Sequence, residues 1–122
     1  MSDVVIEGLE EILKRDLLEH EALLDRTKTE LAAYQAAHIY EKNKKKHYEQ
    51  LLANGKFKLG PMTVALKGID INIRHMKDKM QLSRDKIEHE VLIVNTLKEQ
   101  LENQNNGLAR LAESRRRDAL NH

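Results

Sequence analysis

The chain has 122 residues, of which 34% are charged and 3% aromatic, and it contains no Cys. A compact globular core usually draws on more aromatic side chains, whereas long helices rich in Leu, Glu, Lys and Ala fit this composition. The absence of Cys excludes disulfides and thiolate metal sites. Because no segment has the pattern of a signal peptide or a membrane span, we expect one domain over residues 1–122 in a cytoplasmic protein without membrane contact.

The net charge of +1 conceals an uneven distribution of charged residues. Residues 1–31 have a net charge of −5, residues 32–86 of +7 and residues 87–122 of −1. An anionic partner should therefore bind the basic middle region.

The first predicted helix covers residues 3–53. Asp3 is suited to the N-cap position, and acidic residues follow it in the first turns, where the helix dipole favours them. Neither Pro nor Gly interrupts the chain between Leu9 and Asn54. Apolar residues recur at spacings of three, four and seven, as expected for one helix with an apolar stripe. The stripe includes Leu17, Leu24 and Leu31.

A tip is predicted over residues 54–61, because Asn54-Gly55 and Gly60-Pro61 are both turn signals. Phe57 lies between them, where it either covers the end of the helices or anchors a partner. A loop and a pair of short strands, residues 56–59 and 62–64, are both compatible with this stretch.

The second predicted helix covers residues 62–106 and begins near Pro61, since proline suits the first helical position. Asn105-Asn106-Gly107 has the composition of a C-terminal cap. It would leave residues 107–122 as a short helical or frayed tail. Alternatively the helix continues through Gly107 with a kink, because Leu108 and Leu111 extend its apolar stripe.

A seven-residue repeat dominates this second helix and predicts a coiled-coil seam. We expect an all-α fold, an antiparallel two-helix hairpin in which this seam meets the stripe of the first helix. Residues 15–35 also align without gaps to residues 84–104, with nine of 21 positions identical. Folding the chain between these segments would place His20 near Thr96 and His89 near Thr27. The repeat consists of Leu66, Ile73, Met80, Ile87, Val94, Leu101 and Leu108.

A hairpin alone leaves apolar surface in water, because Val91–Val94 presents apolar side chains on nearly every side of one turn. Each large side chain left exposed forfeits about 1.5–3 kcal/mol. We therefore expect self-association into a helical bundle, most simply a homodimer.

Basic residues near the tip are the candidate contacts for a partner protein or for nucleic acid. Clustered lysines can neutralise phosphates and release counterions, although a solvated charged helix face would have the same composition. The predicted contact residues are Lys42, Lys44, Lys45, Lys46, Lys56, Phe57, Lys58 and Arg74.

No motif indicates catalysis. Glu-His-Glu occurs at residues 19–21 and 88–90, but adjacent side chains on a helix diverge by about 100°. Metal sites in bundles instead place Glu and His three residues apart. We expect no enzymatic activity, no metal and no cofactor.

A long helix, a short tip and a returning helix resemble prefoldin-type chaperone subunits and type III secretion stalk proteins. Residues 44–47 together with Tyr48 and Gly55-Lys56 are also similar to recombination mediator proteins of T-even-like phages. The first prediction for function is accordingly a coiled-coil hairpin that acts through protein–protein contacts, as an assembly factor, adaptor or inhibitor. The alternative is a nucleic-acid-binding accessory protein that uses the basic patch.

Overall fold

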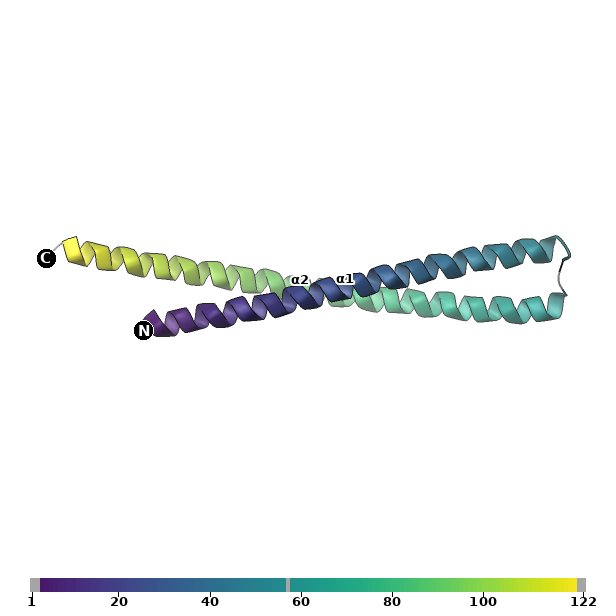
Figure 1. The fold of residues 1–122 in the computed structure, drawn as a ribbon, viewed down its shortest axis with the longest axis horizontal. Coiled ribbons are helices and arrows are strands. Elements are labelled where there is room, and N and C mark those ends of the chain that lie inside the picture. Colours follow the sequence, from purple (N-terminus) through teal and green to yellow (C-terminus); the bar gives the residue numbers. More distant parts are fainter. Residues whose placement is uncertain (1–2, 57, 121–122) are drawn as a thin grey trace. The chain divides into compact units, whose positions relative to one another are not determined.

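The computed structural model describes residues 3–56 and 58–120 and forms two helices, α1 (Asp3–Ala53) and α2 (Leu59–Leu120) (Figure 1). The two helices pack against each other, which confirms the predicted all-α class and agrees with a hairpin. Residues 62–64 are helical, and no strand occurs in the two described ranges. The alternative of two short strands at the tip is therefore wrong, while Phe57 lies outside the described residues.

Helix α1 ends in a Schellman motif, as its Asn54-Gly55 sequence favours. Gly55 has a φ of 69°, the left-handed conformation that costs an L side chain energy but not glycine. Its N–H donates to the carbonyl of Leu52 at 3.0 Å, and the N–H of Lys56 donates to the carbonyl of Leu51 at 3.1 Å. These bonds satisfy carbonyls that the end of a helix otherwise leaves unpaired.

Helix α2 begins at Leu59, three residues before the predicted start. Pro61 is compatible with this earlier start because the N–H groups of the first helical turn have no partner within the helix. The first backbone bond at this end runs from the N–H of Met62 to the carbonyl of Lys58, at 3.3 Å.

Helix α2 also continues through Asn105-Asn106-Gly107 to Leu120, so the predicted end at residue 106 is wrong. Gln104, Leu108 and Leu111 remain half-buried at the spacing of the seam. The packing of these residues offsets the roughly 1 kcal/mol that glycine costs inside a helix.

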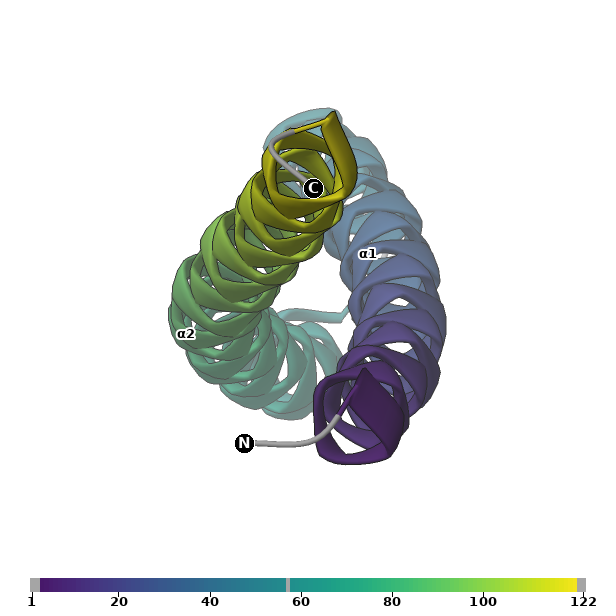
Figure 2. The same cartoon turned by 90° about the vertical axis from the view of Figure 1, so that its left-hand side faces the viewer.

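The chain forms two compact units, which each contain a segment of α1 and a segment of α2. The terminal unit comprises Met1–Asp25 and Glu88–His122, and the turn unit comprises Arg26–Ile87. Both chain ends, marked N and C in Figure 2, belong to the terminal unit. The single domain expected over residues 1–122 stays a prediction.

In the turn unit, the residues shielded from solvent recur in alternating steps of three and four along both helices. Met62, Ile69 and Met80 are its buried apolar residues. Thr27 and Ser83 are buried among them. The half-buried members of the series are Leu31, Tyr34, His38, Glu41, Lys45, Tyr48, Leu52, Leu66, Ile73, Met76 and Ile87.

In the terminal unit the shielded residues follow the same spacing of three and four, but they are of different types. Val94 is its buried apolar residue, and the carboxylate-bearing Glu90 is buried beside it in the sequence repeat. Around them lie half-buried residues of both helices, which are Leu13, Leu17, His20, Leu24, Leu97, Leu101, Gln104, Leu108 and Leu111.

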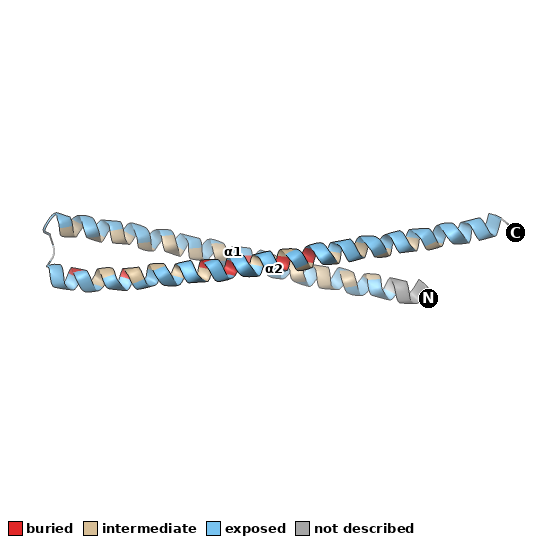
Figure 3. Cartoon of the chain, turned by 180° about the vertical axis from the view of Figure 1, so that it is seen from behind, coloured by how far each residue is buried: buried red, intermediate tan, exposed pale blue. Residues whose placement is uncertain are grey.

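Burial is shallow throughout both units (Figure 3). Among the described residues, no large side chain reaches full burial. Because a fully buried aliphatic side chain contributes about 1.5–3 kcal/mol, each unit draws its stability from many partial contributions.

Candidate interaction surfaces

A polar pair occupies the seam of the terminal unit. Nδ1 of His20 on α1 lies 2.7 Å from a carboxylate oxygen of Glu90 on α2, which is only 8% exposed. A second, more exposed pair joins Glu21 to Lys98 at 3.9 Å. Since a buried carboxylate needs a partner, His20 fixes the pairing of the two helices here.

The predicted approach of His20 to Thr96 stays a prediction, since the partner found for His20 is Glu90. Thr96 lies between the seam positions Val94 and Leu97, is exposed, and donates its hydroxyl to the carbonyl of Leu92 at 2.8 Å. The alignment of the two similar segments matched residue identities, whereas packing matches the positions that face the seam. His89 is likewise exposed.

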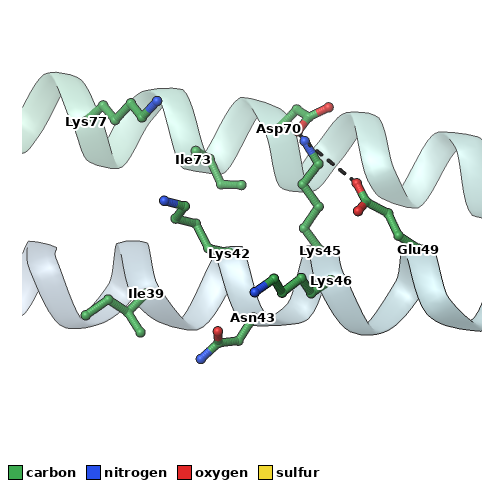
Figure 4. A pocket seen from close by; sticks show the side chains of 9 residues that line it. All are labelled: Ile39, Lys42, Asn43, Lys45, Lys46, Glu49, Asp70, Ile73 and Lys77. Carbon is green, nitrogen blue, oxygen red and sulfur yellow. Dashed lines mark ion pairs between the residues drawn. The ribbon is translucent and has the colours of Figure 1, made fainter.

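An open groove in the turn unit collects basic side chains from both helices (Figure 4). Its volume is about 660 Å³, and Ile39 and Ile73 form its apolar part. Lys42 and Lys46 reach it from α1, and Lys77 reaches it from α2. The arrangement presents ammonium groups above an apolar base, which suits an anionic partner that also carries apolar groups.

Two lysines of the same basic run have partners within the unit. Nζ of Lys45 lies 2.7 Å from an oxygen of Asp70 on α2 and 4.0 Å from an oxygen of Glu49. The hydrogen bond and the charge of Asp70 raise the pKa of Lys45. Nζ of Lys44 lies over the ring of Tyr48, 6.0 Å from its centre. Both lysines were predicted contacts, and their charges are less available to an outside ligand than those of Lys42 and Lys46.

The electrostatic effect of the groove is visible at His38, on the seam just before it. Burial lowers the pKa of His38, and the charges of Lys42 and Lys77 lower it further. Within the described residues, Nε2 of His38 and Oε2 of Glu41 are buried without a hydrogen-bond partner. Two of the lysines that line the groove thus act on a seam residue.

Large apolar side chains also face solvent on both units. On α2, Val64 and Ile71 occupy the same position of the repeat, on the face away from the seam, and are 71% and 59% exposed. Leu92 occupies that position in the terminal unit and is 63% exposed. Leu18 on α1 is 68% exposed. These residues lie outside the seam and remain available for contact.

A smaller, mainly apolar hollow lies beside the tip. It has a volume of about 460 Å³ and is lined by Tyr48, Lys58, Pro61, Met62 and Ala65. The aliphatic stem of a lysine can cover apolar surface while its ammonium stays in water. The tip thus has a small apolar surface next to a positive charge.

The ten predicted seam residues are all at least partly shielded from solvent. Met80 and Val94 are buried, and the other eight are half-buried. Of the predicted contact residues, Lys42, Lys46, Lys56, Lys58 and Arg74 are exposed. Lys77, another lysine of the basic middle region, lies four residues after Ile73, which places both on one face of α2.

Neither helix has, over its described residues, a stretch long and apolar enough to cross a bilayer. In the same residues, no group of three metal-ligating side chains gathers closely enough to hold an ion. No protein-family model matches the sequence, and neither the curated proteins nor the solved structures give a match.

Proposed function

We propose that this chain is a non-enzymatic coiled-coil hairpin that self-associates and acts through protein–protein contacts. The observation that carries the proposal is the exposure of large apolar side chains on α2, Val64 and Ile71 in the turn unit and Leu92 in the terminal unit. Exposed apolar side chains that recur on one helix face are typical of a surface that another helix covers.

Further exposed apolar side chains support the same proposal. Ile12 and Leu18 in the terminal unit and Ile39 in the turn unit are 46%, 68% and 59% exposed. A second copy is the simplest protein able to cover such side chains, and an assembly of this kind can serve as an adaptor, assembly factor or inhibitor.

Light scattering coupled to gel filtration at micromolar concentration tests self-association. We expect a mass of twice 14.2 kDa, and a shift toward the single-chain mass in Val64→Ser/Ile71→Ser/Leu92→Ser. Asp78→Ser is the matched control, because Asp78 is an exposed residue at the same position of the repeat. A single-chain mass for the unchanged protein would contradict self-association.

Contact with a different protein is tested at the tip. We expect Lys56→Ser/Lys58→Ser/Leu59→Ser, which changes three exposed residues, to reduce capture of partners from the native host. The same variant should leave the oligomeric mass unchanged. Equal recovery of every partner by variant and unchanged protein would contradict a role of the tip.

Nucleic-acid binding is the second candidate, and the groove of Lys42, Lys46 and Lys77 favours it. Each phosphate contact releases counterions, so affinity should fall steeply between 50 and 200 mM salt. We expect Lys42→Ser/Lys46→Ser/Lys77→Ser to weaken binding of single- and double-stranded oligonucleotides. The control Lys28→Ser/Lys67→Ser/Lys86→Ser removes the same charge from exposed positions of the same unit. Equal losses in both variants would indicate non-specific attraction, and no binding at 50 mM salt would exclude this candidate.

A further inference from the structure

The division of charge follows the two structural units. The terminal unit, residues 1–25 with 88–122, has seven basic and fourteen acidic residues and a net charge of −7. The turn unit, residues 26–87, has fourteen basic and six acidic residues and a net charge of +8. A nearly neutral chain is thus built from two strongly and oppositely charged parts.

Part of the positive charge of the turn unit is carried by lysines that are exposed to solvent. Lys42, Lys46 and Lys77 are exposed and line the open groove, next to Ile39, which is 59% exposed. Lys45 is held by Asp70, but the unit has no further acid in the groove besides Glu49. The groove therefore offers both apolar surface and unneutralised ammonium groups.

The terminal unit carries the complementary surface. Glu11 and Glu19 on α1 are exposed, and so are Ile12 and Leu18, which precede or follow them in the sequence. On α2, Glu88, Glu99 and Glu102 are exposed on the same unit as Leu92. This combination of carboxylates and aliphatic groups is the chemistry that the groove of the turn unit would bind.

We propose that two copies of the chain pair with the acidic terminal unit of each on the basic turn unit of the other. The inference rests on the proposed self-association and specifies its orientation. A two-fold axis would make the two contacts between the copies equivalent. The opposite orientation would bring like charges together, which disfavours it at contact distances where salt screens little.

Charge-reversal variants test the orientation. Lys42→Glu/Lys46→Glu/Lys77→Glu lowers the turn unit from +8 to +2, and Glu11→Lys/Glu19→Lys/Glu99→Lys raises the terminal unit from −7 to −1. At 50 mM salt we expect each variant alone to dissociate at least about tenfold more readily than the unchanged protein. An equimolar mixture should form a mixed dimer, because one complementary contact is then restored. Circular dichroism checks that each variant keeps its helices.

Cross-linking gives a second measurement that needs no variant. Carbodiimide joins lysines to carboxylates in direct contact, and a mixture of ¹⁴N- and ¹⁵N-labelled chains identifies the links between copies. We expect links from residues 42–46 or Lys77 of one copy to residues 7–25 or 88–102 of the other. Links between copies that connect only like units would overturn the proposal.

The outcomes separate this inference from the proposed function. A dimer that dissociates in Val64→Ser/Ile71→Ser/Leu92→Ser but is unaffected by charge reversal would remove the orientation and keep self-association. A single-chain mass at every salt concentration would remove both. If reversal of the groove lysines abolishes oligonucleotide binding and leaves the dimer intact, the basic unit serves nucleic acid and the proposed pairing is wrong.

Discussion

In the terminal and turn units the residues shielded from solvent follow the same spacing, but the residue types at these positions differ. In the turn unit, three buried apolar residues, Met62, Ile69 and Met80, hold α1 against α2. In the terminal unit, Val94 is the buried apolar residue, and the seam also contains the pair of His20 and Glu90. The spacing of the repeat allows the two helices to pack against each other, whereas the residue type at each position determines how much that packing stabilises the unit.

This difference predicts that the terminal unit unfolds locally more readily than the turn unit. Apolar burial contributes favourably at every position, whereas a buried polar pair contributes little net stability relative to apolar residues of the same size. We therefore expect amide hydrogens of residues 8–25 and 88–111 to exchange faster than those of the turn unit.

The largest effect is expected from removing an apolar anchor of the turn unit. Ile69→Ala should lower the free energy of unfolding by about 2–5 kcal/mol, because the side chain is 3% exposed. Ile71→Ala is the matched control, since the same residue type two positions away is 59% exposed and should change stability by less than about 0.5 kcal/mol. Urea denaturation followed by circular dichroism measures both, and equal losses would contradict the assigned faces of α2.

The polar pair of the terminal unit should show the next largest effect. His20→Leu should cost about 1–3 kcal/mol at pH 7.5, because it leaves the Glu90 carboxylate buried without its partner. His20→Leu/Glu90→Leu should recover this loss, since an apolar pair replaces a buried polar one.

Urea denaturation of a control variant shows whether the loss of stability comes from the contact between His20 and Glu90 or from any substitution in the terminal unit. Glu21→Leu serves as the control, because its ion pair with Lys98 is long and more exposed and should contribute less than about 1 kcal/mol. A double variant as unstable as the sum of its single variants would show that the two side chains do not interact.

Two glycines should respond in opposite directions to the same change. Gly55→Ala should destabilise the turn unit by about 1 kcal/mol, because the residue has a φ of 69°. Gly107→Ala should stabilise the terminal unit by about 1 kcal/mol, because it lies inside α2. An added Cβ meets no atom within 4 Å at either site, so melting temperatures report backbone conformation alone. Destabilisation by Gly107→Ala would restore the predicted cap at residue 107.

The smallest effect is expected from His38 and depends on pH. Its folded pKa lies below the ordinary value of 6.5, so the unfolded chain binds a proton more readily. The contribution of His38 to stability should be constant above pH 6.5 and fall as the pH drops through the folded pKa. His38→Gln should reduce this decline, and melting temperatures from pH 8 to 5 measure the difference. Parallel curves for both proteins would contradict the effect of Lys42 and Lys77.

The repeat made the helix pairing predictable, because alternating steps of three and four leave one face that can be buried. The end of α1 was also predictable, since Gly55 can adopt a conformation that other residues resist. The hydrogen bond between His20 and Glu90 was not, because residue identity in the two similar segments carries no information on which side chains of the two helices meet. Asn105-Asn106-Gly107 was misleading because local cap signals compete with packing of Gln104 and Leu108, and packing prevailed.

For the basic site, the sequence could predict only which basic residues are present, not which partners they contact. The sequence located a run of lysines, but it did not show that Lys45 is joined to Asp70 or that Lys44 lies over Tyr48. That Lys77 lines one groove with Lys42 depends on which residues of the two helices lie opposite each other. Cross-helix neighbours are therefore the information that a single sequence lacks.

The unbroken alternation of three- and four-residue steps limits how this protein can change in length. An insertion of one or two residues in α1 would rotate all that follows by 100–200° and turn Leu17 or Leu24 toward water. An insertion of seven leaves the faces in place, but only an equal insertion in α2 keeps opposed side chains opposed. Longer and shorter forms should therefore differ by whole heptads added to both helices together, with the bend at Gly55 retained.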